Sequence, residues 1–261
     1  MPLMPGAEPF SYDGGRVGVL LCHGFTGTPQ TLRPWAEHLA GADLSVRLPR
    51  LPGHGTTWQE MNMTRWQDWY GEVERALLDL RARCDAVFVA GLSMGGSLAL
   101  RLTQEHPDKV AGLILVNPAV HSEDPARGLL PVLRYVIASL PGLPLDIKKP
   151  DVFYGAYDRL PLHAAYSLTR LWALIRRDLP SITAPLLLLH SPQDHIVAPS
   201  NTALVLAGVS SSDVTDIELV DSYHVATLDN DAPRIFDETL AFVRRLAPAA
   251  ATGGESGRRP G

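Results

Sequence analysis

Residues 86–96 read AVFVAGLSMGG, a short apolar run that leads into Gly91-Leu92-Ser93-Met94-Gly95. Continuous apolar runs of this length suit a strand that is buried on both faces of a parallel sheet. The residues from 94 to 105 have a helix-like pattern that stops before Pro107. A Gly-x-Ser-x-Gly turn between a strand and a helix holds its serine in a strained, accessible conformation. This stretch therefore predicts a strand, a tight turn that carries Ser93, and a helix.

The rest of the chain repeats this alternation of apolar runs and amphipathic segments. Three more runs resemble buried strands: 16–22 (RVGVLLC), 110–116 (VAGLILV) and 185–190 (PLLLLH). Residues 65–83 place apolar side chains at three- and four-residue spacing, which is typical of an amphipathic helix. Strands that alternate with helices predict an α/β fold with a mostly parallel sheet and helices on both faces.

Two segments break the alternation. Residues 121–180 are rich in Pro and Leu and contain no convincing buried strand, so we expect a small inserted cap over the carboxyl edge of the sheet. Residues 247–261 (APAAATGGESGRRPG) contain no large apolar side chain, which predicts a disordered tail. The sequence thus predicts one domain over residues 1–246, with the cap as an insertion in it.

A serine nucleophile needs a histidine base, which an acid must hold in one tautomer. His224 follows an apparent strand at 215–220 and precedes the last amphipathic helix, so it is expected at the edge of the sheet that carries Ser93. Asp194 follows the run 185–190 in the same way. Asp221 and Asp229 compete for the role of the acid, but both are so near His224 that we expect them to cap the next helix or to stay solvated. Ser93, Asp194 and His224 are therefore the predicted catalytic residues.

A tetrahedral intermediate also needs N–H donors for its negative oxygen, and each can be worth about 3 kcal/mol. One donor is expected to be the amide of Met94, directly after the serine. The other is expected in the Gly-rich loop His23-Gly24-Phe25-Thr26-Gly27, where the amide of Phe25 is in position. The same loop also has a purely structural interpretation, as a turn into the helix that Thr28-Pro29 begins.

Composition narrows the classes of function. The chain has 261 residues and a net charge of −5, without the clustered Lys and Arg that binding to nucleic acid requires. Cys22 and Cys84 stand in no metal-binding or redox motif and are expected to be buried thiols, the alternative being a disulfide or a reactive pair. No Gly-x-Gly-x-x-Gly or Walker motif indicates a cofactor. The sequence has no secretory signal and no membrane-spanning run, which predicts a soluble, cytoplasmic protein that uses no cofactor and no metal.

Five motifs together resemble bacterial carboxylesterases and monoacylglycerol lipases of the α/β-hydrolase superfamily. They are 23–27 (HGFTG), 51–55 (LPGHG), 91–96 (GLSMGG), the Asp194 loop and 222–229 (SYHVATLD). The resemblance spans residues 16–246 and implies a cofactor-free hydrolase of short- to medium-chain carboxylic esters or monoacylglycerols, acting through an acyl-enzyme. It assigns Ser93 as nucleophile, His224 as base, Asp194 as its partner, and Phe25 and Met94 as oxyanion amides. Relatives that open epoxides or displace halide carry Asp at the turn, so Ser93 argues against both reactions.

Alternatives remain open at this point. A thioesterase or a C–C bond hydrolase would use the same three residues, and a non-catalytic binding protein of the same fold would not need them intact. Apolar side chains of the cap either line an acyl channel or pack the cap onto the domain; they are Leu129, Leu130, Val132, Leu133, Val136, Ile137, Leu140, Tyr154, Tyr157 and Trp172. Some of them are also expected to touch a lipid surface or micelle in a weak, transient contact. A small ester is the expected partner.

Overall fold

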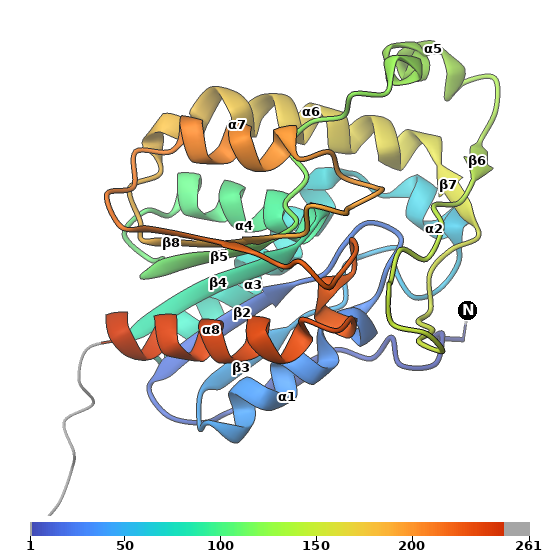
Figure 1. Ribbon diagram of the computed structural model, residues 1–261. Coiled ribbons are helices and arrows are strands. Elements are labelled where there is room, and N and C mark those ends of the chain that lie inside the picture. The colour runs from blue at the N-terminus through green and yellow to red at the C-terminus, as the bar shows by residue number, and fades with distance from the viewer. Residues whose placement is uncertain (1, 248–261) are drawn as a thin grey trace, which may run out of the picture.

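The computed structural model describes residues 2–247, and the predicted tail lies outside the described residues except for Ala247. A seven-stranded sheet runs through the middle of the molecule in the order β1-β3-β2-β4-β5-β8-β9. All neighbouring strands are parallel except β1, which runs antiparallel to β3 at one edge (Figure 1). The strands of this sheet are β1 (Phe10–Tyr12), β2 (Val17–Cys22), β3 (Ser45–Leu48), β4 (Ala86–Leu92), β5 (Gly112–Val116), β8 (Leu186–His190) and β9 (Val214–Glu218).

Helices cover both faces of the sheet. The helices are α1 (Arg33–Gly41), α2 (Trp58–Met63), α3 (Trp66–Arg81), α4 (Met94–Glu105), α5 (Leu130–Leu133), α6 (Leu162–Asp178), α7 (Ser200–Gly208) and α8 (Ala232–Leu246). Helices α1 and α8 lie on one face, and α3, α4 and α7 lie on the other, with α6 beside α4 (Figure 1). Each face has its own buried apolar cluster, so the predicted α/β architecture with a mostly parallel sheet is confirmed.

The apolar runs explain why these strands form in the centre. All seven residues of β4 and all five of β5 are buried, as are the last five of β2. Side chains that alternate between the two faces therefore find a helix layer on either side, which favours a continuous apolar sequence over an alternating one. Helix α3 lies within the predicted range 65–83, as expected, and its residues Trp69, Val73, Leu77 and Leu80 are buried in the core.

The segment 121–180 divides into two parts. The first part contains short 3-10 and α turns (Pro125–Leu129 and α5) and a two-stranded ribbon, β6 (Ser139–Pro141) with β7 (Arg159–Pro161), and it projects beyond the carboxyl ends of the strands (Figure 1). The second part is α6, which packs along α4. The first part, residues 121–161, is the insertion.

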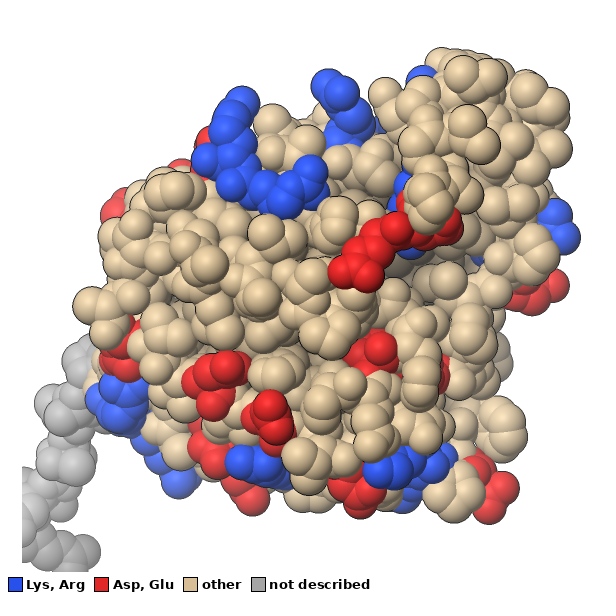
Figure 2. Space-filling model, turned by 45° about the horizontal axis from the view of Figure 1, so that its top comes forward, with Lys and Arg blue, Asp and Glu red and all other residues tan. Residues whose placement is uncertain are grey.

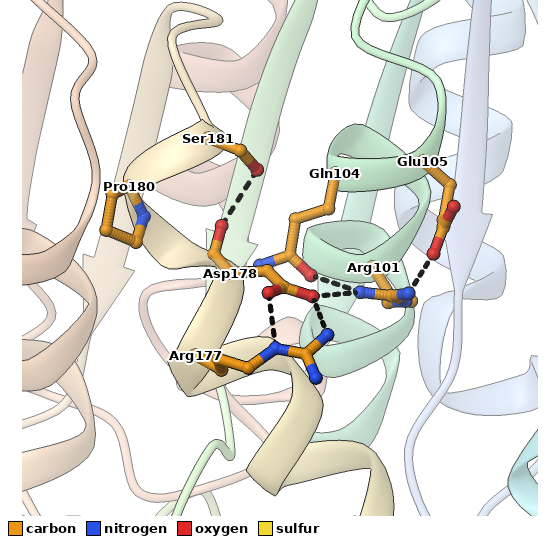
Figure 3. Close-up of a pocket in the computed structure, with 7 residues that line it drawn as sticks. All are labelled: Arg101, Gln104, Glu105, Arg177, Asp178, Pro180 and Ser181. Atoms are coloured by element: carbon orange, nitrogen blue, oxygen red, sulfur yellow. Dashed lines mark hydrogen bonds and ion pairs between the residues drawn. The ribbon is translucent and has the colours of Figure 1, made fainter.

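Helix α6 is fastened to α4 at both its middle and its end. The indole Nε1 of Trp172 donates to the buried Ser97 Oγ at 3.2 Å. At the end of the helix, Arg101 pairs with Asp178 at 2.8 Å, and Arg177 binds the same carboxylate at 2.7 Å (Figure 3). Hydrogen bonds from Arg177, and to a lesser degree from Arg101, lower the pKa of Asp178 to about 2. These ion pairs therefore join α6 to α4, and the charges of the three side chains are paired with one another.

Candidate active site

Ser93 occupies the turn between β4 and α4, at the carboxyl edge of the sheet. Its backbone has φ 57° and ψ −118°, a conformation that side chains with a Cβ rarely adopt. Glycines on either side make the tight turn possible: a Cβ on Gly95 would stand 1.8 Å from the carbonyl oxygen of Cys22 on β2, and one on Gly91 would stand 2.2 Å from the backbone of Gly95. Contact with backbone atoms therefore restricts both positions to glycine. The side chain of Ser93 makes no capping hydrogen bond with the helix that follows it.

His224 and Asp194 are paired next to this turn. The imidazole Nδ1 of His224 lies 2.7 Å from Oδ2 of Asp194, and the two side chains are 9% and 3% exposed. The other carboxylate oxygen accepts N–H bonds from Ile196 at 2.8 Å and Val197 at 2.7 Å, within the loop that follows β8. Because Asp194 accepts these bonds on one oxygen, its other oxygen faces Nδ1 of His224 and accepts the N–H there, which leaves Nε2 as an acceptor.

Asn117 forms hydrogen bonds with the loop that carries His224. It follows β5 with φ 43°, and its Nδ2 donates to the carbonyl oxygen of His224 at 2.8 Å. Its Oδ1 accepts from the backbone N–H of Ser191, at the end of β8, at 2.7 Å. Asn117 thus connects the loops of His224 and Asp194. Asn117 is absent from the residues predicted for the site, although the dipeptide Asn117-Pro118 directly after an apolar run is a signal for a special turn.

Ser93 and His224 line one cavity at the carboxyl edge. The loop from Gly24 to Gly27 lines it as well, including Phe25. Gly24 approaches Ser93 so closely that a Cβ on this glycine would lie 3.5 Å from that of the serine. Met94 is the first residue of α4, directly after the serine. The fold therefore brings all five predicted residues to the same edge of the sheet, although they lie up to 199 positions apart in the sequence.

Two buried histidines hold the Gly-rich loop in place. His23 accepts the backbone N–H of Leu51 at Nε2 (3.2 Å) and donates from Nδ1 to the carbonyl of Gly24 (3.0 Å). Burial lowers the pKa of His23 to about 4. The ring of His54 packs edge-on against that of His23 at 5.1 Å, and burial also lowers its pKa. Both histidines are neutral at pH 7 and join the loop at 23–27 to the motif at 51–55.

The expectation for Asp229 was wrong. Asp229 neither caps α8 nor stays solvated: it is 2% exposed and accepts backbone N–H bonds from Tyr223 at 2.9 Å, Lys148 at 2.7 Å and Lys149 at 2.8 Å. Four such donors, counting Asn230, compensate for the loss of water around the carboxylate. Asp221, by contrast, is exposed and pairs with Lys148 at 2.9 Å.

The apolar side chains of the cap, considered as a channel lining or as packing, lie in different environments. Tyr154 lines the cavity of Ser93 and His224. Tyr157 and Trp172 are instead buried in the core, where the hydroxyl of Tyr157 donates to the carbonyl of Gly53 at 2.7 Å. Leu129, Val132 and Val136 are 64–75% exposed on the projecting part of the insertion. Tyr157 and Trp172 therefore follow the packing alternative, whereas Leu129, Val132 and Val136 neither pack nor line the cavity. The cavity wall comes from another part of the insertion, which includes Leu143 and Pro144.

Cys22 and Cys84 are both free and buried, and burial raises the pKa of each thiol. Within residues 2–247, no group of three or more His, Cys, Asp or Glu side chains is placed to hold a metal ion. None of the helices in the same part of the chain is long and apolar enough to cross a membrane.

The parallel sheet, the strained serine turn after β4, and the Asp and His loops after β8 and β9 define the chain as an α/β-hydrolase. The model of the family described as "Serine aminopeptidase, S33" matches residues 16–231, and the chain belongs to this family.

Relatives with named activities cover almost the whole chain. It is 43% identical to a thermostable monoacylglycerol lipase from Bacillus sp. (strain H-257) over 251 residues, which are 94% of this chain and 98% of that lipase. It is 25% identical to a carboxylesterase from Bacillus subtilis over 92% of this chain and 97% of the relative. A solved structure from a study of LipS and LipT, two metagenome-derived lipolytic enzymes, has a TM-score of 0.91 at 40% identity and covers 94% of this chain and 100% of that one. The resemblance in the motifs is thereby confirmed over the full length of the domain.

Proposed function

We propose that the protein is a serine hydrolase that cleaves carboxylic esters with an apolar acyl chain, of the monoacylglycerol or short- to medium-chain type. The observation that carries this proposal is the buried 2.7 Å pair of His224 and Asp194 beside the cavity that also holds Ser93. The names of the relatives, monoacylglycerol lipase and carboxylesterase, support the same class of reaction.

The proposed reaction has two halves. Ser93 Oγ attacks the ester carbonyl while Nε2 of His224 takes its proton, and Asp194 stabilises the imidazolium that forms. Collapse of the tetrahedral intermediate breaks the bond to the alcohol, which leaves with the proton from His224. Water then repeats the sequence on the acyl-enzyme, releases the acid and restores Ser93.

The amides of Phe25 and Met94 are the proposed donors to the negative oxygen of each intermediate. Met94 is at the N-terminus of α4, where backbone N–H groups have no partner within the helix. Phe25 is on the Gly-rich loop, which lines the same cavity as Ser93. Fixed donors of this kind stabilise the transition state more than the ground state, which is what increases kcat.

The cavity wall supports an apolar substrate. Leu143, Pro144, Ile196 and Val225 contribute apolar surface, and Tyr154 adds an aromatic ring. Burial raises the pKa of Tyr154 to about 12, so its hydroxyl keeps its proton. An acyl chain gains about 0.8 kcal/mol for each CH₂ group buried against such a wall, which favours esters over small polar substrates.

We also propose that residues 121–180 act as the cap of the domain, and that its projecting part makes a transient contact with lipid. Five large apolar side chains are exposed there: Leu129, Val132, Tyr135, Val136 and Ile137. The projecting lobe at the upper right of Figure 2 is largely free of charged side chains. Exposed apolar patches on a protein surface typically mark a contact with a partner or a lipid.

A chain-length series of monoacylglycerols, compared with matched ethyl esters and acyl-CoA thioesters, tests the substrate class. We expect the esters to be turned over and kcat/KM to rise with acyl length until the pocket is full. Ser93→Ala should abolish both turnover and labelling by a fluorophosphonate probe, while the exposed Ser210→Ala serves as the matched control and keeps both. A wild-type protein that the probe does not label would contradict the proposal and favour a binding protein; preference for the thioester would make it a thioesterase.

A further inference from the structure

Asp146 lies in the loop of the insertion between β6 and β7, and its environment is unusual for a carboxylate. It is 7% exposed, whereas its apolar neighbours Leu143 and Leu145 are 38% and 43% exposed. The local sequence, Leu143-Pro144-Leu145-Asp146, thus turns its charged residue inward, while both leucines stay partly exposed. A carboxylate pays a large desolvation penalty when it is buried, so its position must be stabilised by hydrogen-bond donors.

Three donors converge on the Asp146 carboxylate. The backbone N–H groups of His224 and His195 each donate to Oδ2 at 3.1 Å, and Nδ1 of the His195 ring lies 2.7 Å from Oδ1. In addition, the main-chain carbonyl of Asp146 accepts from the N–H of Val225 at 3.0 Å. One residue of the insertion therefore binds both the loop that carries Asp194, through its neighbour His195, and the loop that carries His224.

A second carboxylate fixes the same stretch in the opposite direction. Asp229, on the histidine loop, accepts the backbone N–H groups of Lys148 and Lys149 from the insertion. Residues 146–149 are thus joined to residues 223–229 by hydrogen bonds in both directions. Leu143 and Pro144, three and two positions before Asp146, belong to the wall of the cavity. The segment that contacts the proposed substrate is therefore continuous with the segment that holds the histidine loop.

We propose that Asp146 is a positioning residue of the reaction: the insertion uses this carboxylate to set His224 against Asp194 and Ser93. The inference rests on the function proposed above, in which His224 is the base. Proton transfer depends steeply on geometry, and a displacement of about 1 Å can cost about a hundredfold in rate. Asp146 acts at the backbone N–H of His224 and at the adjacent loop, so it fixes where the imidazole stands without touching the substrate.

Asp146→Asn is the most informative variant. The amide keeps the size of the side chain but has one acceptor oxygen, so it cannot accept from the two backbone N–H groups and from the N–H of the His195 ring together. We expect kcat for a short-chain ester to fall about tenfold or more while KM stays within about threefold of wild type. Each kcat is expressed per serine labelled at completion by a fluorophosphonate, so that unfolded molecules do not enter the comparison.

Lys148→Met is the matched control. Lys148 also ties the insertion to the histidine loop, through its ion pair with the exposed Asp221 and its ammonium 5.9 Å from the ring of Tyr223. Its side chain makes no hydrogen bond or ion pair with Asp194, His195 or His224. This variant should keep the wild-type kcat. A purely structural role for Asp146 would lower the melting temperature and the labelled fraction, and leave kcat per labelled serine unchanged.

His195→Ala keeps the test decisive if Asp146→Asn does not fold. The His195 side chain is 59% exposed, so its loss is tolerable for the fold, and it removes one of the three donors to Asp146. We expect a smaller fall in kcat, about two- to fivefold, with KM unchanged. A per-serine kcat at the wild-type level in the folded variants, or an effect on KM alone, overturns the inference. Failure of the probe to label wild-type protein would instead contradict the proposed function, so the two failures are distinguishable.

Discussion

The Nδ1 atom of His224 lies 2.7 Å from Oδ2 of Asp194, and both side chains are almost completely buried. Since the other oxygen of Asp194 is occupied by two backbone N–H groups, the carboxylate cannot turn away from the imidazole. The pair is therefore fixed before any substrate binds, and one tautomer of His224 is favoured. Preorganisation of this kind avoids a reorganisation cost in the transition state.

Asp194→Asn should lower kcat by about a thousandfold to ten thousandfold and leave the fold intact. The amide can present its NH₂ group to Nδ1, which places the histidine proton on Nε2 and removes the acceptor that Ser93 needs. Steady-state kinetics with a chromogenic ester would measure the loss, with the exposed Asp221→Asn, on the loop of His224, as the control for a charge change. A variant that retains more than about a tenth of the wild-type kcat would mean that Asp194 is not the orienting acid.

Gly95→Ala should prevent formation of the serine turn. Its Cβ would stand 1.8 Å from the Cys22 carbonyl on a central strand, where backbone cannot move without disrupting β2. We expect a loss of stability of several kcal/mol, at the upper end of what single substitutions cause (~4 kcal/mol or more), and loss of activity. Urea unfolding measures the change.

The matched control for that substitution is Gly71→Ala, in the middle of α3, where an added Cβ meets nothing within 4 Å. This variant should gain up to about 1 kcal/mol of stability, because Ala is the better helix former. Equal behaviour of the two variants would show that steric contact at Gly95 does not determine the turn.

The sequence predicts the central strands well because each is a continuous apolar run that is buried on both faces of the sheet. Five of the predicted strands agree with β2, β4, β5, β8 and β9 to within two residues at each end, and the predicted helix 94–105 agrees with α4. Strands β1 and β3 were missed. In β3, Arg47 interrupts the apolar pattern, and it is compatible with the sheet only because Asp79 and Asp13 pair with it at 2.7 and 2.6 Å. That compensation comes from distant residues, which a local pattern cannot reveal.

In the candidate site too, some residues are indicated by the local sequence and others depend on distant residues. Ser93, Asp194, His224, Phe25 and Met94 could be predicted because each follows the end of a strand, and parallel strands end at a common edge. Asn117, Asp146 and Asp229 act by hydrogen bonds to the backbone of loops that are 6–107 positions away. Any sequence supplies a backbone N–H or C=O, so these partners leave no signature in residue type. For Asp146, the surrounding Pro- and Leu-rich stretch indicated packing and hid a polar contact.

Asp178→Asn should weaken the junction of α4 and α6 without changing kcat. The carboxylate binds Arg101 and Arg177, but it is 26% exposed, so solvent screening limits the loss of stability to about 1 kcal/mol. Urea unfolding at neutral pH measures it, and Asp108→Asn, a 75% exposed carboxylate that pairs only loosely with Lys109, is the control. A kcat that falls together with the stability would indicate that the position of α6 affects the cavity.

Acid should destabilise the protein through the buried His23. In the folded chain, burial lowers the pKa of His23 from 6.5 to about 4, so below pH 6.5 the unfolded chain binds a proton that the folded chain does not. The free energy of unfolding should therefore be unaffected by this group above pH 6.5 and should fall by about 3 kcal/mol as the pH decreases to 4. His54, whose pKa is lowered for the same reason, acts in the same direction.

Urea titrations between pH 4 and pH 6.5 measure the slope of the free energy of unfolding against pH. His23→Asn should reduce the slope, whereas His38→Gln, which replaces a partly exposed histidine near α8, should retain it. An unchanged slope in His23→Asn would show that this buried ring does not take part in acid denaturation.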